Sequence, residues 1–78
     1  LNKDNFKISD CIWWNNPNNI KNLSVKVRYR SDAIPCKISK DQGGEYTIRL
    51  DKKERAITPG QSAVVYKDDM VVGGGIIL

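Results

Sequence analysis

Three basic residues at alternate positions, Lys26, Arg28 and Arg30, are the clearest candidates for binding chemistry in this chain. On an extended strand, side chains alternate between two faces, so the three cations would share one face and Tyr29 would lie on the other. Successive charges would then be about 6.5–7 Å apart, comparable to the phosphate spacing of a nucleic-acid strand. Such a row can position a backbone without reading its sequence. An ordinary solvated strand face has the same pattern, and residue types alone slightly favour it.

Trp13 and Trp14 form an aromatic pair in a chain with few aromatic residues. On a strand their rings would point to opposite faces, so we expect one ring in the core. The other ring must pack against another domain or stack on a base, and the first of these roles is favoured.

The sequence contains no recognisable set of catalytic residues. The chain has no histidine, the commonest general base, and its serines lack an identifiable base partner. Gly73, Gly74 and Gly75 are not followed by the Lys-Ser/Thr of a phosphate loop, so we expect them to mark a bulge or a close backbone approach. The scattered acidic residues are interpreted as solvated turn formers: Asp41, Asp51, Asp68 and Asp69. We therefore predict no catalytic residues and no cofactor site in this chain.

Cys11 and Cys36 are predicted to be reduced and partly buried, because small secreted domains usually carry more cysteines. Without histidine, the chain lacks the four ligands of a structural zinc site, and we predict no metal. The formal net charge of +4 permits an anionic partner without requiring one. Residues 1–6 do not resemble a signal peptide, and no apolar stretch is long enough to span a bilayer, which favours a cytoplasmic location.

Alternating apolar residues predict the strands that would position these side chains. Alternation marks residues 6–12, 23–30, 34–39 and 46–51, and no window has the period of an amphipathic helix. In the first segment Phe6, Ile8 and Ile12 share one parity, and Asp10 is the exception.

Turn residues separate these strands. We expect a loop at residues 15–19 with a short helical turn after Pro17, a hairpin turn at Gln42-Gly43-Gly44, a type II turn at Thr58-Pro59-Gly60 and a tight connection at Asp68-Asp69. Several short strands at this spacing predict an all-β fold, either a small barrel or a sandwich. At 78 residues, the chain is long enough for one domain, residues 1–78.

Four ordered blocks carry a resemblance to a known family. They read Val-Lys-Val-Arg-Tyr-Arg at residues 25–30, Ile-Pro-Cys at 34–36, Arg-Ala-Ile-Thr-Pro-Gly-Gln-Ser-Ala-Val-Val-Tyr at 55–66 and Val-Gly-Gly-Gly-Ile-Ile at 72–77. Their order and spacing resemble the C-terminal domain of bacterial tRNA-specific 2-thiouridylase over about residues 23–77. The charged stretch at residues 51–54 departs from the family pattern, and the segment before Leu23 resembles it only weakly.

This resemblance implies a small antiparallel β-barrel of about six short strands, similar to domain 2 of translation elongation factors. It implies that the parent enzyme 2-thiolates the wobble uridine of tRNA and uses ATP in a separate N-terminal domain. The family's reactive cysteines also lie there, so Cys11 and Cys36 are not matched to them. A chain that begins with Leu1 is expected to be part of a longer product or to follow a trimmed tag. The implied partners are tRNA, the N-terminal and central domains of the parent, and a sulfur-donor protein.

The resemblance also implies tRNA contacts for Arg28, Tyr29 and Gln61. Strand periodicity adds Lys26 and Arg30 to this predicted set. Because Arg28 and Tyr29 would point to opposite faces of a strand, either the strand bends there or one residue contacts RNA through its backbone.

The alternative hypothesis is an elongation-factor-like barrel that acts mainly as an interdomain or protein interaction module. Trp13, Trp14 and the apolar C-terminal segment motivate it. It predicts an exposed apolar patch larger than that of a typical monomer.

Overall fold

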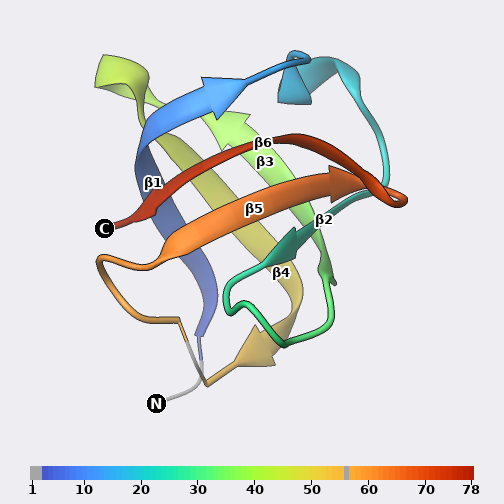
Figure 1. Ribbon diagram of the computed structural model, residues 1–78. Helices are drawn as coiled ribbons and strands as arrows, with labels where there is room; N and C mark the ends of the chain where they lie inside the picture. The colour runs from blue at the N-terminus through green and yellow to red at the C-terminus, as the bar shows by residue number, and fades with distance from the viewer. Residues whose placement is uncertain (1–2, 56) are drawn as a thin grey trace.

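The computed structural model describes residues 3–55 and 57–78. These residues form six strands and two short 3₁₀ helices (Figure 1): β1 (Lys3–Trp13), η1 (Pro17–Asn19), β2 (Leu23–Lys26), β3 (Ile34–Lys40), η2 (Gln42–Gly44), β4 (Tyr46–Glu54), β5 (Ser62–Lys67) and β6 (Met70–Ile77). Leu1, and Ala56 of the block at residues 55–66, lie outside the described residues.

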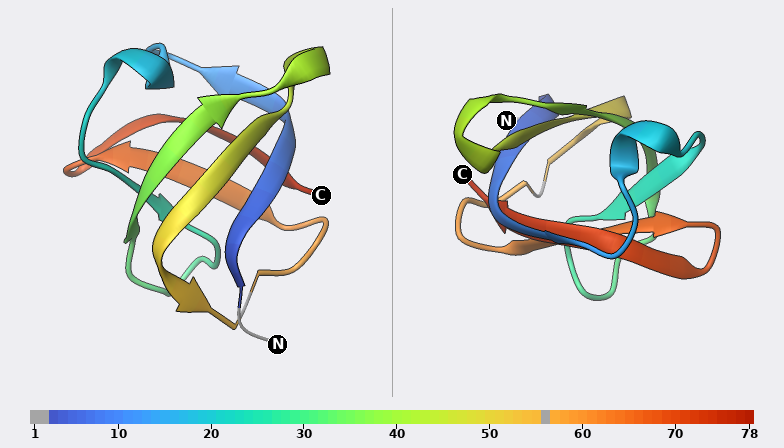
Figure 2. Two further views of the ribbon diagram at one scale, coloured as in Figure 1. Left: turned by 180° about the vertical axis from the view of Figure 1, so that it is seen from behind. Right: turned by 90° about the horizontal axis from the view of Figure 1, so that it is seen from above.

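The six strands close into a barrel in the order β1-β4-β3-β2-β5-β6. Neighbouring strands are antiparallel, and β6 pairs with β1 through Ile8 and Ile77 to complete the ring. Figure 2 shows this closure from behind and from above. The predicted small antiparallel barrel is therefore confirmed, and the sandwich that the residue pattern left open is excluded.

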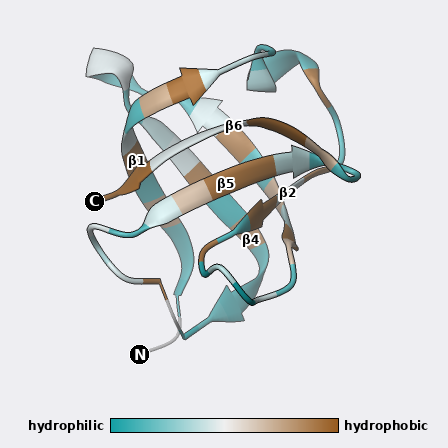
Figure 3. Ribbon diagram, viewed as in Figure 1, coloured by the Kyte–Doolittle hydropathy of each residue, from teal (hydrophilic) through white to brown (hydrophobic). Residues whose placement is uncertain are grey.

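One core fills the barrel. Ile8, Val25, Ile48 and Val65 are fully buried, and each comes from a different strand. Along β2 and the first part of β4, apolar residues alternate with polar ones (Figure 3), because successive side chains point into and out of the barrel. Burial of each such side chain contributes about 1.5–3 kcal/mol. The alternation that predicted the strands is thus the pattern that fills the core.

Strand β1 departs from the predicted alternation at Asp10. Asp10 has a φ of 51°, and the register of β1 against β6 shifts between Ser9 and Ile12. An irregularity of this kind moves the following residues to the opposite face. The prediction that Ile12 shares the face of Ile8 is therefore wrong, since Ile12 is 65% exposed while Trp13 packs against the core.

The predicted turns are present. A helical turn follows Asn16, η2 joins β3 to β4 with positive φ at Gly43, and Asp68 has a φ of 54° between β5 and β6. In the turn before β5, Gly60 has a φ of 90°, which the third position of a type II turn requires.

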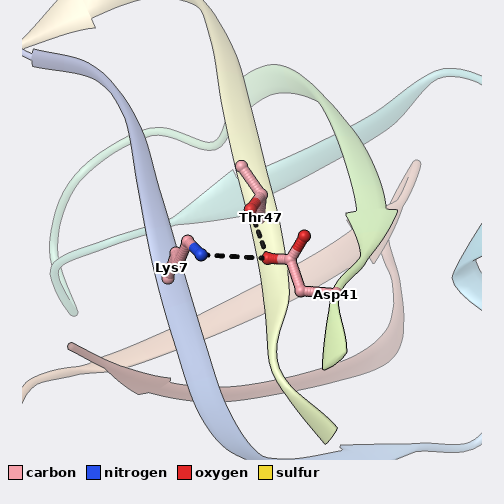
Figure 4. Close-up of polar contacts among 3 residues, drawn as sticks. All are labelled: Lys7, Asp41 and Thr47. Carbon is pink, nitrogen blue, oxygen red and sulfur yellow. Dashed lines mark hydrogen bonds and ion pairs between the residues drawn. The ribbon is translucent and has the colours of Figure 1, made fainter. Parts of the chain in front are cut away.

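Asp41 links the β3–β4 hairpin to β1 (Figure 4). The hydroxyl of Thr47 donates a hydrogen bond to Oδ2 of Asp41, and Nζ of Lys7 lies 3.8 Å from the same oxygen. The Lys7 side chain is 57% exposed, so we expect the ion pair to contribute only about 0–1 kcal/mol. Asp41, interpreted from the sequence as a solvated turn former, thus also ties three strands together.

Candidate nucleic-acid interface

The basic segment after β2 is a turn and not the predicted strand. Strand β2 ends at Lys26, and the backbone N–H and hydroxyl of Ser31 both donate to the carbonyl oxygen of Arg28, at 3.3 and 2.9 Å. Tyr29 and Arg30 are the central residues of this turn. The chain must reverse here because β3 returns alongside β2, with Ile34 paired to Val25. The predicted row of three cations on one strand face is therefore wrong.

Because residues 28–31 form a turn, Arg28 and Tyr29 need not point to opposite faces of a strand. Both side chains are exposed, and Tyr29 is 91% exposed, because turn residues do not alternate between two faces as strand residues do. The bend that the sequence left as one of two options is thus present. Both side chains reach solvent on the outside of the barrel.

Both backbone polar groups of Gln61 are hydrogen-bonded. Its N–H donates to the carbonyl oxygen of Thr58 at 3.2 Å, and its own carbonyl oxygen accepts from the N–H of Ile77 at 2.9 Å. Gly60 donates in turn to the carbonyl oxygen of Ile77 at 2.8 Å. The exposed amide side chain of Gln61 therefore projects from a well-anchored backbone just before β5.

The pairing of β2 with β5 brings these two turns together. Lys26 at the end of β2 is paired with Val64 of β5, three residues after Gln61. The two strands run side by side in opposite directions in Figure 1. Lys26, Arg28, Tyr29 and Gln61 consequently line one pocket of about 290 Å³, which we call the β2–β5 pocket. Arg30, the fifth residue of the predicted set, is exposed in the turn but does not line the pocket.

Tyr66 is a pocket residue that sequence reasoning missed. Its ring lines the β2–β5 pocket, and Nζ of Lys26 lies 5.3 Å from the ring centroid, within cation–π range. Tyr66 pairs with Ser24, so it is the diagonal cross-strand neighbour of Lys26. The two residues are 40 positions apart in the sequence. No local signal identifies such a neighbour, because the contact depends on the register between β2 and β5.

The chemistry of the β2–β5 pocket suits an anionic ligand with a flat ring. Lys26 and Arg28 supply positive charge, Tyr29 and Tyr66 supply aromatic surface, and Gln61 supplies an amide donor and acceptor. None of the described residues that line the pocket is acidic. Cations that hold phosphates and aromatic rings that stack on bases are the usual components of a single-stranded nucleic-acid site.

A second surface lies next to this pocket and is apolar. Ile12, Trp14 and Val71 are 65%, 69% and 44% exposed, and they line a groove of about 330 Å³. The groove is also lined by the backbone of Gly73, Gly74 and Gly75, and we call it the apolar groove. The expected division of the tryptophan pair is confirmed: Trp13 packs on the core, with its ring 5.1 Å from that of Tyr46, whereas Trp14 faces outward.

The two cysteines are poorly suited to nucleophilic chemistry. Burial, with a smaller effect from Asp51, raises the pKa of Cys36 to about 12. Burial also raises the pKa of Cys11, with a smaller effect from Asp10. Both side chains therefore remain thiols at neutral pH, and the thiolate is the nucleophile in cysteine chemistry. Both are free cysteines, as predicted.

The described residues contain neither a cluster of metal ligands nor a membrane-spanning helix. Within residues 3–55 and 57–78, no group of three or more Cys, Asp or Glu side chains is placed to hold a metal ion. Over the same residues, no helix has the length and apolar character needed to cross a membrane.

The fold and the pocket together define a small closed β-barrel domain with a basic and aromatic pocket on its wall. Residues 3–77 match the family described as the aminomethyltransferase beta-barrel domain. The chain belongs to this family, and the resemblance to the C-terminal domain of tRNA-specific 2-thiouridylase is confirmed.

Three similar proteins are much longer than this chain. It is 40% identical to a tRNA-specific 2-thiouridylase of Francisella philomiragia, over all of this chain and 22% of the relative. It is 43% identical to one from Idiomarina loihiensis, over 81% of this chain and 17% of the relative. A third, from Shewanella denitrificans, is 51% identical over 70% of this chain and 15% of the relative. The chain thus spans about a fifth of the length of these proteins.

Proposed function

We propose that this domain binds tRNA for a longer enzyme that 2-thiolates uridine, and that the β2–β5 pocket is the contact site. The observation that carries the proposal is the convergence of Lys26, Arg28, Tyr29 and Gln61 on one pocket. Three of these residues are those for which the sequence resemblance implied a tRNA contact. Arg30 contributes charge near the pocket from its exposed position in the turn.

The relatives support the choice of substrate. They are named tRNA-specific 2-thiouridylases, and this chain is 40% identical to one of them over its whole length. We infer that the longer enzyme uses ATP and a sulfur-donor protein, with ATP bound in another domain. This chain then supplies binding energy and orientation but no reacting group, as expected from its lack of histidine and its protonated thiols.

The test is tRNA affinity in the longer enzyme after Arg28→Ala and Gln61→Ala. We expect Arg28→Ala to weaken tRNA binding about tenfold, the loss of a hydrogen bond to a charged group, and Gln61→Ala to weaken it less. ATP affinity should not change in either variant. Wild-type tRNA affinity in both variants would overturn the assignment of the site.

Lys37→Ala is the matched control. Lys37 is also exposed and basic, but it lies on β3 and does not line the pocket. If Lys37→Ala weakened tRNA binding as much as Arg28→Ala, the effect would reflect general positive charge instead of a defined contact.

The second candidate function is an interdomain contact, and the apolar groove favours it. Trp14, Ile12 and Val71 are large apolar side chains gathered at one exposed place. Exposed apolar patches often mark protein contacts. We propose that another domain of the longer enzyme covers this groove. The two candidate functions use different residues, so both can hold in the same protein.

A further inference from the structure

The two tyrosines of the β2–β5 pocket differ in how they are held. Tyr29 is 91% exposed at the tip of its turn, whereas Tyr66 is half-buried on the outer face of β5. A half-buried ring has less room to change its rotamer than an exposed one. The pocket therefore combines one half-buried and one fully exposed aromatic side chain.

Lys26 lies over the ring of Tyr66. Its Nζ lies 5.3 Å from the centroid of Tyr66, and both side chains project outward from paired strands. The cation–π contact restricts the conformations of the long Lys26 side chain before a ligand binds. Less conformational entropy is then lost on binding. Lys26 is therefore a preorganised point charge beside an aromatic surface.

The size of the pocket limits its ligand. About 290 Å³ is at the lower limit for pockets that bind small molecules. A double helix presents phosphates and groove edges but hides the faces of its bases. Aromatic side chains can stack only on bases that have left the helical stack.

We propose that the β2–β5 pocket binds one unpaired nucleotide of RNA, with Tyr66 as its aromatic wall and Lys26 as a phosphate contact oriented by the Tyr66 ring. This inference rests on the proposed function and extends it from RNA in general to a single-stranded nucleotide. In this proposal the Tyr66 ring stacks on the base and also orients Lys26, which contacts the phosphate.

The experiment is an NMR titration of the 78-residue chain with two RNA probes. One is single-stranded tetrauridylate, and the other is a short RNA duplex at the same phosphate concentration. We expect tetrauridylate to shift the signals of Lys26, Arg28, Gln61 and Tyr66 and to bind at least about fivefold more tightly than the duplex, the effect of one stacking contact. Equal affinity for the two probes would overturn the inference.

Variants separate this inference from the proposed function. Tyr66→Leu should weaken tetrauridylate binding about fivefold, and Tyr66→Phe, which keeps the ring, should restore most of the loss. If Arg28→Ala weakens RNA binding but Tyr66→Leu does not, the nucleotide pocket is wrong and the proposed function stands. If neither variant weakens binding, both are wrong.

A further variant covers the case in which Tyr66→Leu does not fold. Lys26→Gln leaves the Tyr66 ring in place and removes only the charge. Lys26→Gln should weaken tetrauridylate binding more than the equivalent control, Lys37→Gln, does. Equal effects of the two substitutions would contradict the phosphate contact.

Discussion

The β2–β5 pocket and the apolar groove are neighbours on the barrel wall that share Ser62 and Val64 of β5, yet they differ in chemistry and in construction. The pocket is built by two turns that meet beside paired strands, and its lining is basic and aromatic. The groove lies over β1, β5 and β6, and its lining is mainly apolar side chains and glycine backbone, with Asp10 and Ser62 as its polar residues. Strand β5 thus borders both a basic, aromatic surface and a mainly apolar one.

The difference in construction has a consequence for tolerance to mutation. Arg28, Tyr29 and Gln61 of the pocket have exposed side chains, which can be replaced without disturbing the core. The glycines of the groove are close-approach points between strands, where a side chain has no room. A Cβ atom at Gly74 would lie 2.2 Å from the carbonyl oxygen of Ala63.

Gly74→Ala should therefore produce the largest effect. We expect it to lower the free energy of unfolding by about 3 kcal/mol, since the clash is with backbone and cannot be relieved by a rotamer change. Chemical denaturation monitored by tryptophan fluorescence measures this. The control is Ser62→Ala, at a site on β5 that borders both surfaces, which should stay within about 0.5 kcal/mol of wild type. Equal stability of the two variants would mean that the groove backbone is not closely packed.

Arg28→Glu should have the next largest effect. It should weaken tRNA binding and leave the stability of the barrel unchanged. Replacing a phosphate contact with a negative charge should weaken tRNA binding in the longer enzyme by about 2 kcal/mol, near thirtyfold. The slope of log affinity against log salt should also fall by about 0.7 or more, because one fewer phosphate is neutralised. An unchanged slope would contradict a phosphate contact at Arg28.

Trp14→Ser should have a smaller effect that depends on the protein in which it is made. In the longer enzyme, loss of an interdomain contact should lower thermal stability by roughly 1 kcal/mol, while tRNA affinity stays unchanged. In the 78-residue chain, the same substitution should change stability by less than about 0.5 kcal/mol, since Trp14 is 69% exposed. Calorimetry of both proteins makes the comparison. A large loss in the short chain would assign Trp14 to the barrel itself.

The smallest expected effect is the coupling between the two surfaces. Arg28→Ala and Trp14→Ser should be additive in tRNA affinity to within about 0.5 kcal/mol, because they belong to different surfaces and share no contact. A double-mutant cycle in the longer enzyme measures this term. A larger coupling would show that the pocket and the groove act as one site.

The sequence by itself determined most of the architecture. Alternation along four segments predicted strands whose inward residues, such as Val25 and Ile48, do fill the core. Turn residues such as Gly60 and Asp68 placed the connections, because their backbone conformations are favoured locally. The ordered blocks identified the family, which residues 3–77 match. These features could be predicted because each depends on neighbours in the chain or on an ordered motif.

The tertiary structure decided what local patterns could not. The periodicity at residues 25–30 predicted a strand, but β2 ends at Lys26 because the chain must turn to pair with β3. The bulge at Asp10 reversed the faces of Ile12 and Trp13 and so created the apolar groove. The register of β2 against β5 placed Tyr66 beside Lys26. Each of these outcomes depends on which strands pair and at what register, and that is settled only when the whole barrel closes around its core.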